Sequence, residues 1–284
     1  MKTGMILEGG AMRGMYTAGV LDVMMENHVE VDGVIGVSAG AVFGCNYKSG
    51  QIGRVIRYNT KYCSDERYFS LKSLITTGDL YGAEFCYNEL PNHLDLFDVE
   101  AYQKNPVEFY VTCTDVHTGS PVYHLCDKGD AEDIQWMRAS ASMPLVSRVV
   151  SVGGYDLLDG GISDSIPIRW FWKQGYKKNF VILTQPEGYK KKPSRLIPIF
   201  KMFMPKYPAI AEAMERRHRN YNGSLKAVKM LEERGQAFVL RPSEPLNIGC
   251  TEKDPEKLKQ VYQAGREDAL EHLQGMKDFL ASNI

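Results

Sequence analysis

Residues 36–40 of this chain read Gly-Val-Ser-Ala-Gly, which places a serine between two glycines. A short run rich in apolar residues, 32–35, precedes them, and Ala-Val-Phe follows at 41–43. This order predicts a strand, a sharp turn and a helix, the setting in which G-x-S-x-G forms a nucleophile elbow. Gly36 and Gly40 leave room for the turn, and Ser38 would stand above the sheet at a helix N-terminus. A plain N-cap role for Ser38 is the alternative.

A second glycine-rich turn, residues 8–14, lies between a predicted strand at 3–7 and a predicted helix at 15–27. Backbone N–H groups in such a turn can converge on an anion, so the turn is a candidate oxyanion hole if it lies near Ser38. The alternative is a dinucleotide-binding turn. Gly9, Gly10 and Gly14 do not match the G-x-G-x-x-G spacing which that function requires.

Asp159 ends a predicted strand and precedes Gly160 and Gly161. A turn is the simpler interpretation of this segment. If the carboxylate reaches Ser38, Asp159 is a candidate general base. A Ser-His-Asp triad is the competing arrangement, and the chain order of α/β-hydrolases leaves His218 and His272 as candidates. Both histidines lie in charged helical sequence that is typical of a solvent-exposed surface.

These blocks, together with residues 139–144 (Ala-Ser-Ala-Ser-Met-Pro), resemble the patatin-like phospholipase family, in the same order along the chain. The resemblance implies a Ser38–Asp159 dyad without a catalytic histidine. It also implies a hydrolase that cleaves lipid or other acyl esters, with no metal or organic cofactor. A Ser-His-Asp esterase or thioesterase, or a non-catalytic lipid-binding module on the same fold, is the alternative.

The resemblance assigns roles in the 8–14 loop as well. Gly9, Gly10 and Ala11 would supply backbone donors to the oxyanion, and Arg13 would help to hold the loop in place. The family usually has glycine where this chain has Ala11. Alanine keeps the N–H group but disfavours positive φ, so the geometry of the loop at this residue is open.

Strands that alternate with helices predict an α/β fold, with a mainly parallel sheet and helices on both faces. The family fold is a three-layer arrangement of this kind. We expect one domain over residues 1–284, with a catalytic core at 1–185 and a mostly helical C-terminal part, 186–284, packed on it. Short helices and loops are expected over 60–105. Strands are predicted at 3–7, 32–35, 107–113, 120–125, 146–152, 155–158, 180–184 and 237–240, and long helices at 15–27, 209–234 and 255–280.

Composition narrows the class of protein. The formal net charge of −1 gives no reason to expect a nucleic-acid partner. The six cysteines contain no C-x-x-C pair, and His, Cys and acidic residues show no compact metal-ligand spacing. The first residues lack a signal-peptide core, and no apolar stretch approaches a membrane span. The expectation is therefore a cytoplasmic protein with free thiols.

The segment 190–207 begins with basic residues and continues with an apolar, proline-containing run. Such a segment favours contact with an anionic membrane, here peripherally at the inner surface. A lid over the site and a helix buried in the core are the other interpretations. Acyl-chain length, headgroup and oligomeric state are not predicted by the sequence.

Overall fold

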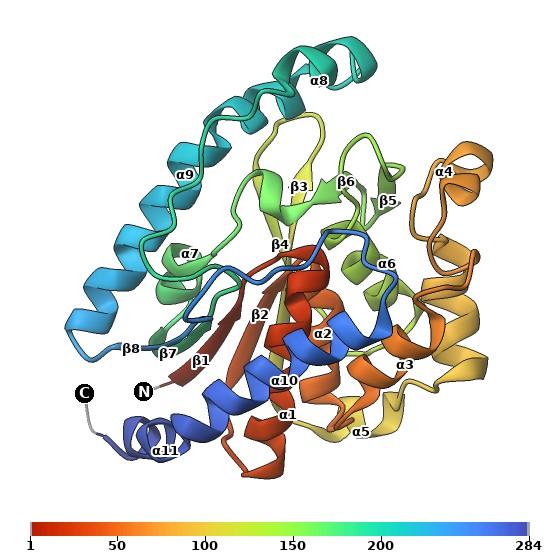
Figure 1. Ribbon diagram of the computed structural model, residues 1–284. Coiled ribbons are helices and arrows are strands. Elements are labelled where there is room, and N and C mark those ends of the chain that lie inside the picture. Colours follow the sequence, from red (N-terminus) through yellow and green to blue (C-terminus); the bar gives the residue numbers. More distant parts are fainter. Residues whose placement is uncertain (1, 283–284) are drawn as a thin grey trace.

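The strands of the computed structural model, which describes residues 2–282, form one eight-stranded sheet (Figure 1). In chain order they are β1 (Lys2–Leu7), β2 (Gly33–Val37), β3 (Glu108–Asp115), β4 (Pro121–Leu125), β5 (Val150–Val152), β6 (Tyr155–Asp159), β7 (Tyr176–Ile182) and β8 (Ala237–Leu240). Their order in the sheet is β5-β6-β3-β2-β1-β7-β8, and β4 pairs with β3.

The five strands from β3 to β8 in this order are parallel, whereas β4, β5 and β6 run antiparallel to their neighbours. The predicted mainly parallel sheet is confirmed. Parallel strands place their carboxyl ends at one edge, which is where ligands bind in folds of this class.

Helices cover both faces of the sheet, as predicted (Figure 1). One face is covered by α1 (Gly14–Glu26), α2 (Ala39–Lys48), α3 (Arg54–Tyr62), α6 (Ala131–Ser140) and α10 (Pro255–Glu271), and the other by α7 (Ile168–Lys173) and α9 (Pro208–Glu233). The remaining helices are α4 (Leu71–Thr77), the π-helix η2 (Phe85–Leu94), α5 (Val99–Lys104), α8 (Ile197–Phe203), α11 (Leu273–Ala281) and the 3₁₀ turns η1 (Ala11–Arg13) and η3 (Gly160–Ile162). None of the helices in residues 2–282 is long and apolar enough to span a membrane.

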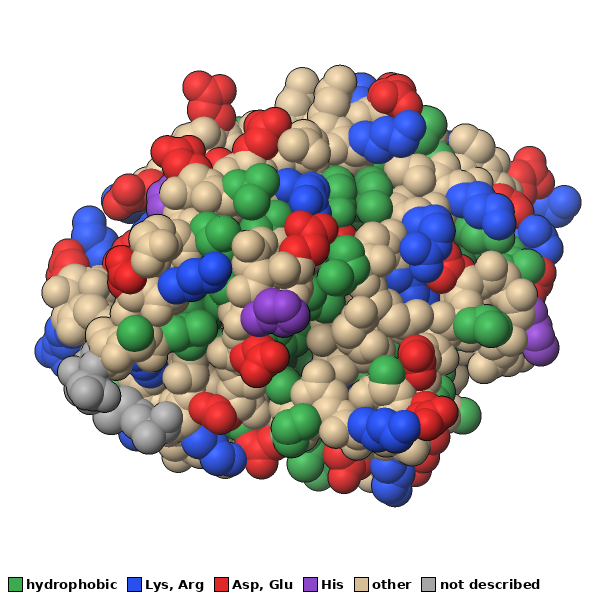
Figure 2. Space-filling view, turned by 90° about the horizontal axis from the view of Figure 1, so that it is seen from below, with side chains coloured by type: hydrophobic (Ala, Val, Ile, Leu, Met, Phe, Trp, Pro, Cys, Tyr) green, Lys and Arg blue, Asp and Glu red, His purple; other side chains and the backbone are tan. Residues whose placement is uncertain are grey.

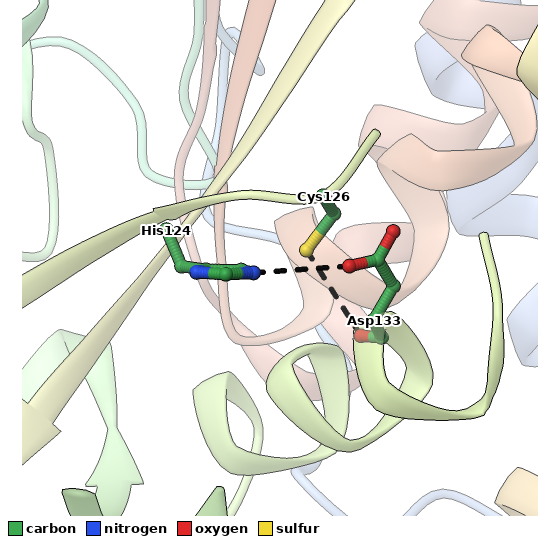
Figure 3. Close-up of side chains that lie close together, drawn as sticks. All are labelled: His124, Cys126 and Asp133. Atoms are coloured by element: carbon green, nitrogen blue, oxygen red, sulfur yellow. Dashed lines mark hydrogen bonds and ion pairs between the residues drawn. The ribbon is translucent and has the colours of Figure 1, made fainter. Parts of the chain in front are cut away.

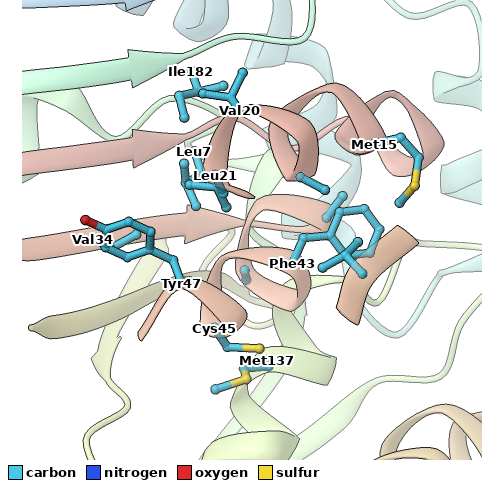
Figure 4. Close-up of a cluster of buried hydrophobic side chains, with 14 of the residues drawn as sticks. Leu7, Met15, Val20, Leu21, Val34, Phe43, Cys45, Tyr47, Met137 and Ile182 are labelled. Carbon is cyan, nitrogen blue, oxygen red and sulfur yellow. The ribbon is translucent and has the colours of Figure 1, made fainter. Parts of the chain in front are cut away.

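The pleat of β1 divides its side chains between two cores. Met5 and Leu7 belong to the cluster under α1 and α2, and Ile6 belongs to the cluster under α7 and α9. Figure 4 shows the first cluster, in which side chains of β1, β2 and β7 meet those of α1, α2 and α6. Both faces of the central strands are therefore buried, as expected for parallel strands.

The C-terminal helix α10 packs backbone to backbone on α1. A Cβ atom on Gly19 would lie 2.1 Å from the Tyr262 carbonyl oxygen, and one on Gly265 would lie 2.0 Å from that of Tyr16. The two glycines therefore permit a close helix crossing, which brings the end of the chain onto the predicted core.

Three predicted boundaries were wrong. The strand expected at 146–152 covers only 150–152, because the backbone of Val146 and Arg148 pairs with Leu80 and Asp79 instead of with a strand. The strand expected at 180–184 begins at 176 and ends at 182. The helix expected over 255–280 is interrupted at His272, whose Nδ1 atom and N–H group both lie at the Asp268 carbonyl. The 60–105 segment consists of short helices and loops, as expected.

The lower face of the molecule carries acidic and basic side chains intermixed (Figure 2). No single sign of charge dominates the view, in agreement with a formal net charge of −1.

Candidate active site

Ser38 forms a strained turn between β2 and α2. Its backbone has φ 55° and ψ −122°, an uncommon conformation for a residue other than glycine. Gly36 and Gly40 make the turn possible, because a Cβ atom on either would lie 2.4 Å from a backbone carbonyl oxygen. The Ser38 side chain makes no capping hydrogen bond to α2. The geometry is that of a nucleophile elbow and differs from that of a plain N-cap.

Ser140 fixes the backbone of this elbow. Its hydroxyl accepts a 3.0 Å hydrogen bond from the Ser38 N–H group and donates a 2.7 Å hydrogen bond to the Thr112 carbonyl. Ser140 is completely buried at the end of α6. The resemblance had drawn attention to residues 139–144 without giving them a role.

Asp159 lies at the end of β6, beside Ser38. The strand register explains this position. Val37, the residue before Ser38, pairs with Thr112 of β3, and the next residue of β3, Cys113, pairs with Asp159. Its Oδ1 atom accepts a 2.7 Å hydrogen bond from the Gly161 N–H group. The two predicted residues are therefore brought together from positions that are distant in the sequence.

Burial raises the pKa of the Asp159 carboxyl above its ordinary value of 3.8. The Ser38 hydroxyl, the Gly161 N–H group and the positive charge of Arg217 oppose this rise. Asp159 is only 6% exposed, so the carboxyl group beside the Ser38 hydroxyl is largely desolvated.

The glycine-rich loop passes directly over the elbow. A Cβ atom on Gly9 would lie 2.8 Å from both the Ser38 Cβ atom and the Val37 carbonyl oxygen. The N–H groups of Gly9, Gly10 and Ala11 donate no hydrogen bond to any residue that the structure describes. Three backbone donors are therefore available close to Ser38.

Ala11 adopts φ 48°, in the left-handed region. The loop thus keeps a backbone conformation that glycine adopts more easily, and alanine at this position introduces local strain.

A family model described as "Patatin-like phospholipase" matches residues 5–172, which include the loop, the elbow and Asp159. The chain belongs to the patatin-like phospholipase family. Residues 207–281 match a second model, a domain of unknown function (DUF6363).

Relatives of this patatin-like chain include both named and uncharacterised proteins. It is 33% identical over 196 residues to the uncharacterised protein YjjU of Escherichia coli, covering 64% of this chain and 52% of YjjU. It is 24% identical over 276 residues to lysophospholipase NTE1 of Lodderomyces elongisporus, covering 92% of this chain and 18% of that protein. The chain thus spans about half of the first relative and less than a fifth of the second.

Two solved structures are similar over 97% of this patatin-like chain. VipD from Legionella pneumophila has a TM-score of 0.48 and 11% identity, with 67% of its chain covered. The type III effector ExoU has a TM-score of 0.39 and 14% identity, with 53% of its chain covered.

Glu8 holds the glycine-rich loop, residues 8–14, in place, a role that the sequence did not reveal. Its buried carboxylate accepts hydrogen bonds from the Thr184 N–H group (2.6 Å) and from the Tyr221 hydroxyl (2.5 Å). Burial raises the pKa of Glu8, and the charges of Arg13 and Lys191 oppose the rise. Arg13 therefore lies close enough to act on this carboxyl, and its role in holding the loop stays a prediction. Tyr221 belongs to α9, so the C-terminal helices also support the site.

A cavity of about 130 Å³ extends from Ser38 beneath the segment 54–97. Its walls are mainly aromatic and apolar, with Ala11, Met12 and Phe43 near the serine and several side chains from the short helices beyond. The latter are Tyr58, Tyr68, Tyr81, Tyr87, Leu90, Pro91 and Phe97. No function was predicted for this segment from the sequence, although its many tyrosine and phenylalanine residues are visible there.

The histidines of the triad alternative lie elsewhere. His218 lines a separate pocket beside α9, and His272 lies between α10 and α11. Within residues 2–282, the lining of the Ser38 cavity includes no histidine. The geometry therefore favours the dyad over the triad.

The fold also gathers three potential metal ligands that sequence spacing did not reveal: His124, Cys126 and Asp133 (Figure 3). One carboxylate oxygen of Asp133 accepts hydrogen bonds from the backbone at Lys128 and Gly129, and the other lies 3.7 Å from the His124 ring. The ring stacks on Trp136 at 4.0 Å. The Cys126 thiol lies 4.0 Å from the Asp133 carbonyl oxygen. Each of the three groups therefore has a contact within the fold, and the cluster lies beside the first half of β3.

Proposed function

We propose that this protein is a serine hydrolase of lipid acyl esters that works through a Ser38–Asp159 dyad. The observation that carries the proposal is the contact of a strained, cavity-lining serine with a buried carboxyl group under a loop of unpaired N–H groups. A nucleophile, a base and oxyanion donors are the three elements that acyl transfer requires.

In the proposed reaction, Asp159 accepts the proton of the Ser38 hydroxyl as the oxygen attacks the ester carbonyl. The N–H groups of Gly9, Gly10 and Ala11 stabilise the negative charge on the carbonyl oxygen. The alcohol leaves with the proton, and a covalent acyl-Ser38 ester remains. Water then attacks this ester and loses a proton to Asp159, which passes the proton to the Ser38 oxygen as the fatty acid leaves.

The cavity supports a lipid as substrate. The lining includes Arg54, Asp79 and Arg138, but both arginines are already paired, with Asp95 and with Asp79. The remaining walls are mainly aromatic and apolar and suit an acyl chain. NTE1, one of the relatives, is named a lysophospholipase. We therefore infer that single-chain lysophospholipids are the first substrates to test.

We further propose that α8 contributes to peripheral membrane contact. Phe200 is buried against α9, but Met202 and Phe203 on the same helix are 65% and 66% exposed. Across the molecule, α4 exposes Leu71 and Ile75 at the same upper end (Figure 1). Exposed apolar side chains on both sides of the catalytic edge suit a lipid surface.

Release of fatty acid from lysophosphatidylcholine tests the enzyme proposal. Wild type and the exposed-serine control Ser64→Ala are expected to release fatty acid at equal rates, and Ser38→Ala is expected to release none above background. Equal rates in Ser38→Ala and wild type would refute the role of Ser38.

Sedimentation with vesicles of phosphatidylglycerol and phosphatidylcholine tests the membrane proposal. The double variant Met202→Asp, Phe203→Asp should bind less than wild type and less than Met230→Asp, which changes an exposed methionine on α9. Unchanged binding of the double variant would contradict a contact through α8.

A further inference from the structure

A second pocket lies between the segment 189–194 and α9, and its lining is strongly basic. It carries five permanent or potential cations and, among the described residues, no carboxylate. The lining consists of Tyr189, Lys190, Lys191, Lys192, Ser194, Met214, Arg217 and His218. The carboxyl group that acts on Lys191 is that of Glu8, which is buried and already accepts hydrogen bonds from Thr184 and Tyr221. Like charges gathered in one lining repel one another, so such a pocket is stabilised when an anion enters it.

Lys191 is held in a defined position in this pocket. Its backbone N–H group donates to the Asn222 side chain at 2.9 Å, and its carbonyl accepts from the same amide at 3.0 Å. The ammonium group lies 4.5 Å from the centre of the Tyr221 ring. Burial and the neighbouring Arg217 lower the pKa of Lys191 to about 8. Lys191 is therefore a restrained cation and differs from a freely moving surface lysine.

Polar groups around the pocket lack partners. The Nδ1 atom of His218 is buried and makes no hydrogen bond within the described residues. Lys191 is half-buried, and its ammonium group donates no hydrogen bond to the described residues, although its backbone is paired with Asn222. Buried polar groups are nearly always hydrogen-bonded in proteins, so the unpaired His218 nitrogen in the wall of this pocket points to a ligand.

Arg217 connects this pocket to the catalytic residues. Its Nε atom donates a 2.5 Å hydrogen bond to the carbonyl of Gly161, next to the proposed base. Its charge acts on both Asp159 and Lys191. The pocket therefore lies next to the segment that follows Asp159, close to the proposed base.

We propose that the Lys191–Arg217–His218 pocket binds a phosphate group, that of the acyl ester whose chain occupies the cavity at Ser38. The inference rests on the proposed hydrolase function for the identity of the ester. A phosphate supplies several acceptor oxygens and negative charge, which match one ammonium, one guanidinium and one imidazole group. Free phosphate carries the same chemistry, so the experiment separates the two sources.

The kinetic arm compares two esters with the same acyl chain, lysophosphatidic acid and monoacylglycerol. In Lys191→Met the ratio of kcat/KM for the phosphorylated over the neutral ester should fall about 10- to 100-fold, mainly through KM. Lys191→Arg should retain most of the ratio. Lys229→Met, at an exposed position on α9, should leave the ratio unchanged. An equal effect of Lys191→Met on both esters would overturn the headgroup assignment.

The binding arm needs no turnover and uses the Ser38→Ala protein with inorganic phosphate and with glycerol 3-phosphate. Both ligands should raise Tm, and the added Lys191→Met substitution should abolish the rise. If wild type hydrolyses neither ester but phosphate still stabilises Ser38→Ala through Lys191, the proposed hydrolase function fails and the phosphate pocket stands. If phosphate binds but the kinetic ratio does not change, the pocket serves free phosphate and the headgroup proposal is wrong. If neither anion raises Tm, the phosphate pocket itself is refuted.

Discussion

Replacement of Asp159 by asparagine separates a catalytic from a structural role. Asparagine keeps the shape of the side chain, and its oxygen can still accept the hydrogen bond from the Gly161 N–H group. It cannot take a proton from Ser38. General-base catalysis contributes about 10²- to 10⁴-fold, so kcat/KM should fall by that factor, equivalent to about 3 to 5 kcal/mol of transition-state stabilisation.

Stability should respond in the opposite direction. Because burial raises the pKa of Asp159 in the folded protein, its contribution to the free energy of unfolding is complete below pH 3.8 and is lost as pH rises through the folded-state pKa. A neutral asparagine escapes this loss. We therefore expect Asp159→Asn to unfold at the same Tm as wild type or higher at pH 8, while being nearly inactive.

The assay is the pH dependence of kcat/KM with a soluble acyl ester, accompanied by thermal unfolding at pH 5 and pH 8. In wild type, activity should rise with pH as Asp159 ionises, with a midpoint above 3.8, and this limb should vanish in Asp159→Asn. A variant that retains activity within a few-fold of wild type, or that keeps the same limb, would refute the assignment of the base.

Three further substitutions test the supports of the site. Gly9→Ala should lower kcat/KM about 10²- to 10³-fold, the effect of losing one oxyanion donor, because its Cβ atom meets the elbow. Gly249→Ala should be neutral in the same assay, because its Cβ atom would make only an ordinary contact, 3.9 Å from the Thr251 backbone nitrogen. Ser140→Ala leaves a buried N–H group and a buried carbonyl unpaired and should lower the free energy of unfolding by about 1 to 3 kcal/mol in denaturant titrations, more than Ser142→Ala, which loses a single contact. Tyr221→Phe removes a hydrogen-bond donor from the buried Glu8 carboxylate, so it should lower the free energy of unfolding more at pH 8 than at pH 5. An equal decrease at both pH values would contradict an ionised Glu8.

The sequence allowed prediction of those parts of the site that depend on local backbone geometry. A turn that admits only glycine at Gly36 and Gly40 leaves a readable pattern, because any Cβ atom there would clash with a carbonyl oxygen. The alternation of strands and helices likewise predicted the parallel sheet, although its antiparallel edge at β5 and β6 was not foreseen.

Features that depend on long-range contacts were missed. Ser140 reaches the elbow from 102 residues away, and Tyr221 reaches Glu8 from 213 residues away. No periodicity or spacing encodes such pairs. The cavity was missed for the same reason, since its walls come from the irregular segment 54–97. Similarly, the basic run at 190–192 suggested a membrane contact, but its enclosure by Arg217 and His218 becomes visible only in the folded chain.

The most direct test of the central claim is labelling with a fluorophosphonate probe, with the adduct read by intact mass and peptide mapping. The account predicts one adduct on Ser38 in wild type, none in Ser38→Ala, and a sharp fall in labelling rate in Asp159→Asn. A folded wild-type protein that takes up no probe, or an adduct on another residue, would contradict an activated serine at this elbow.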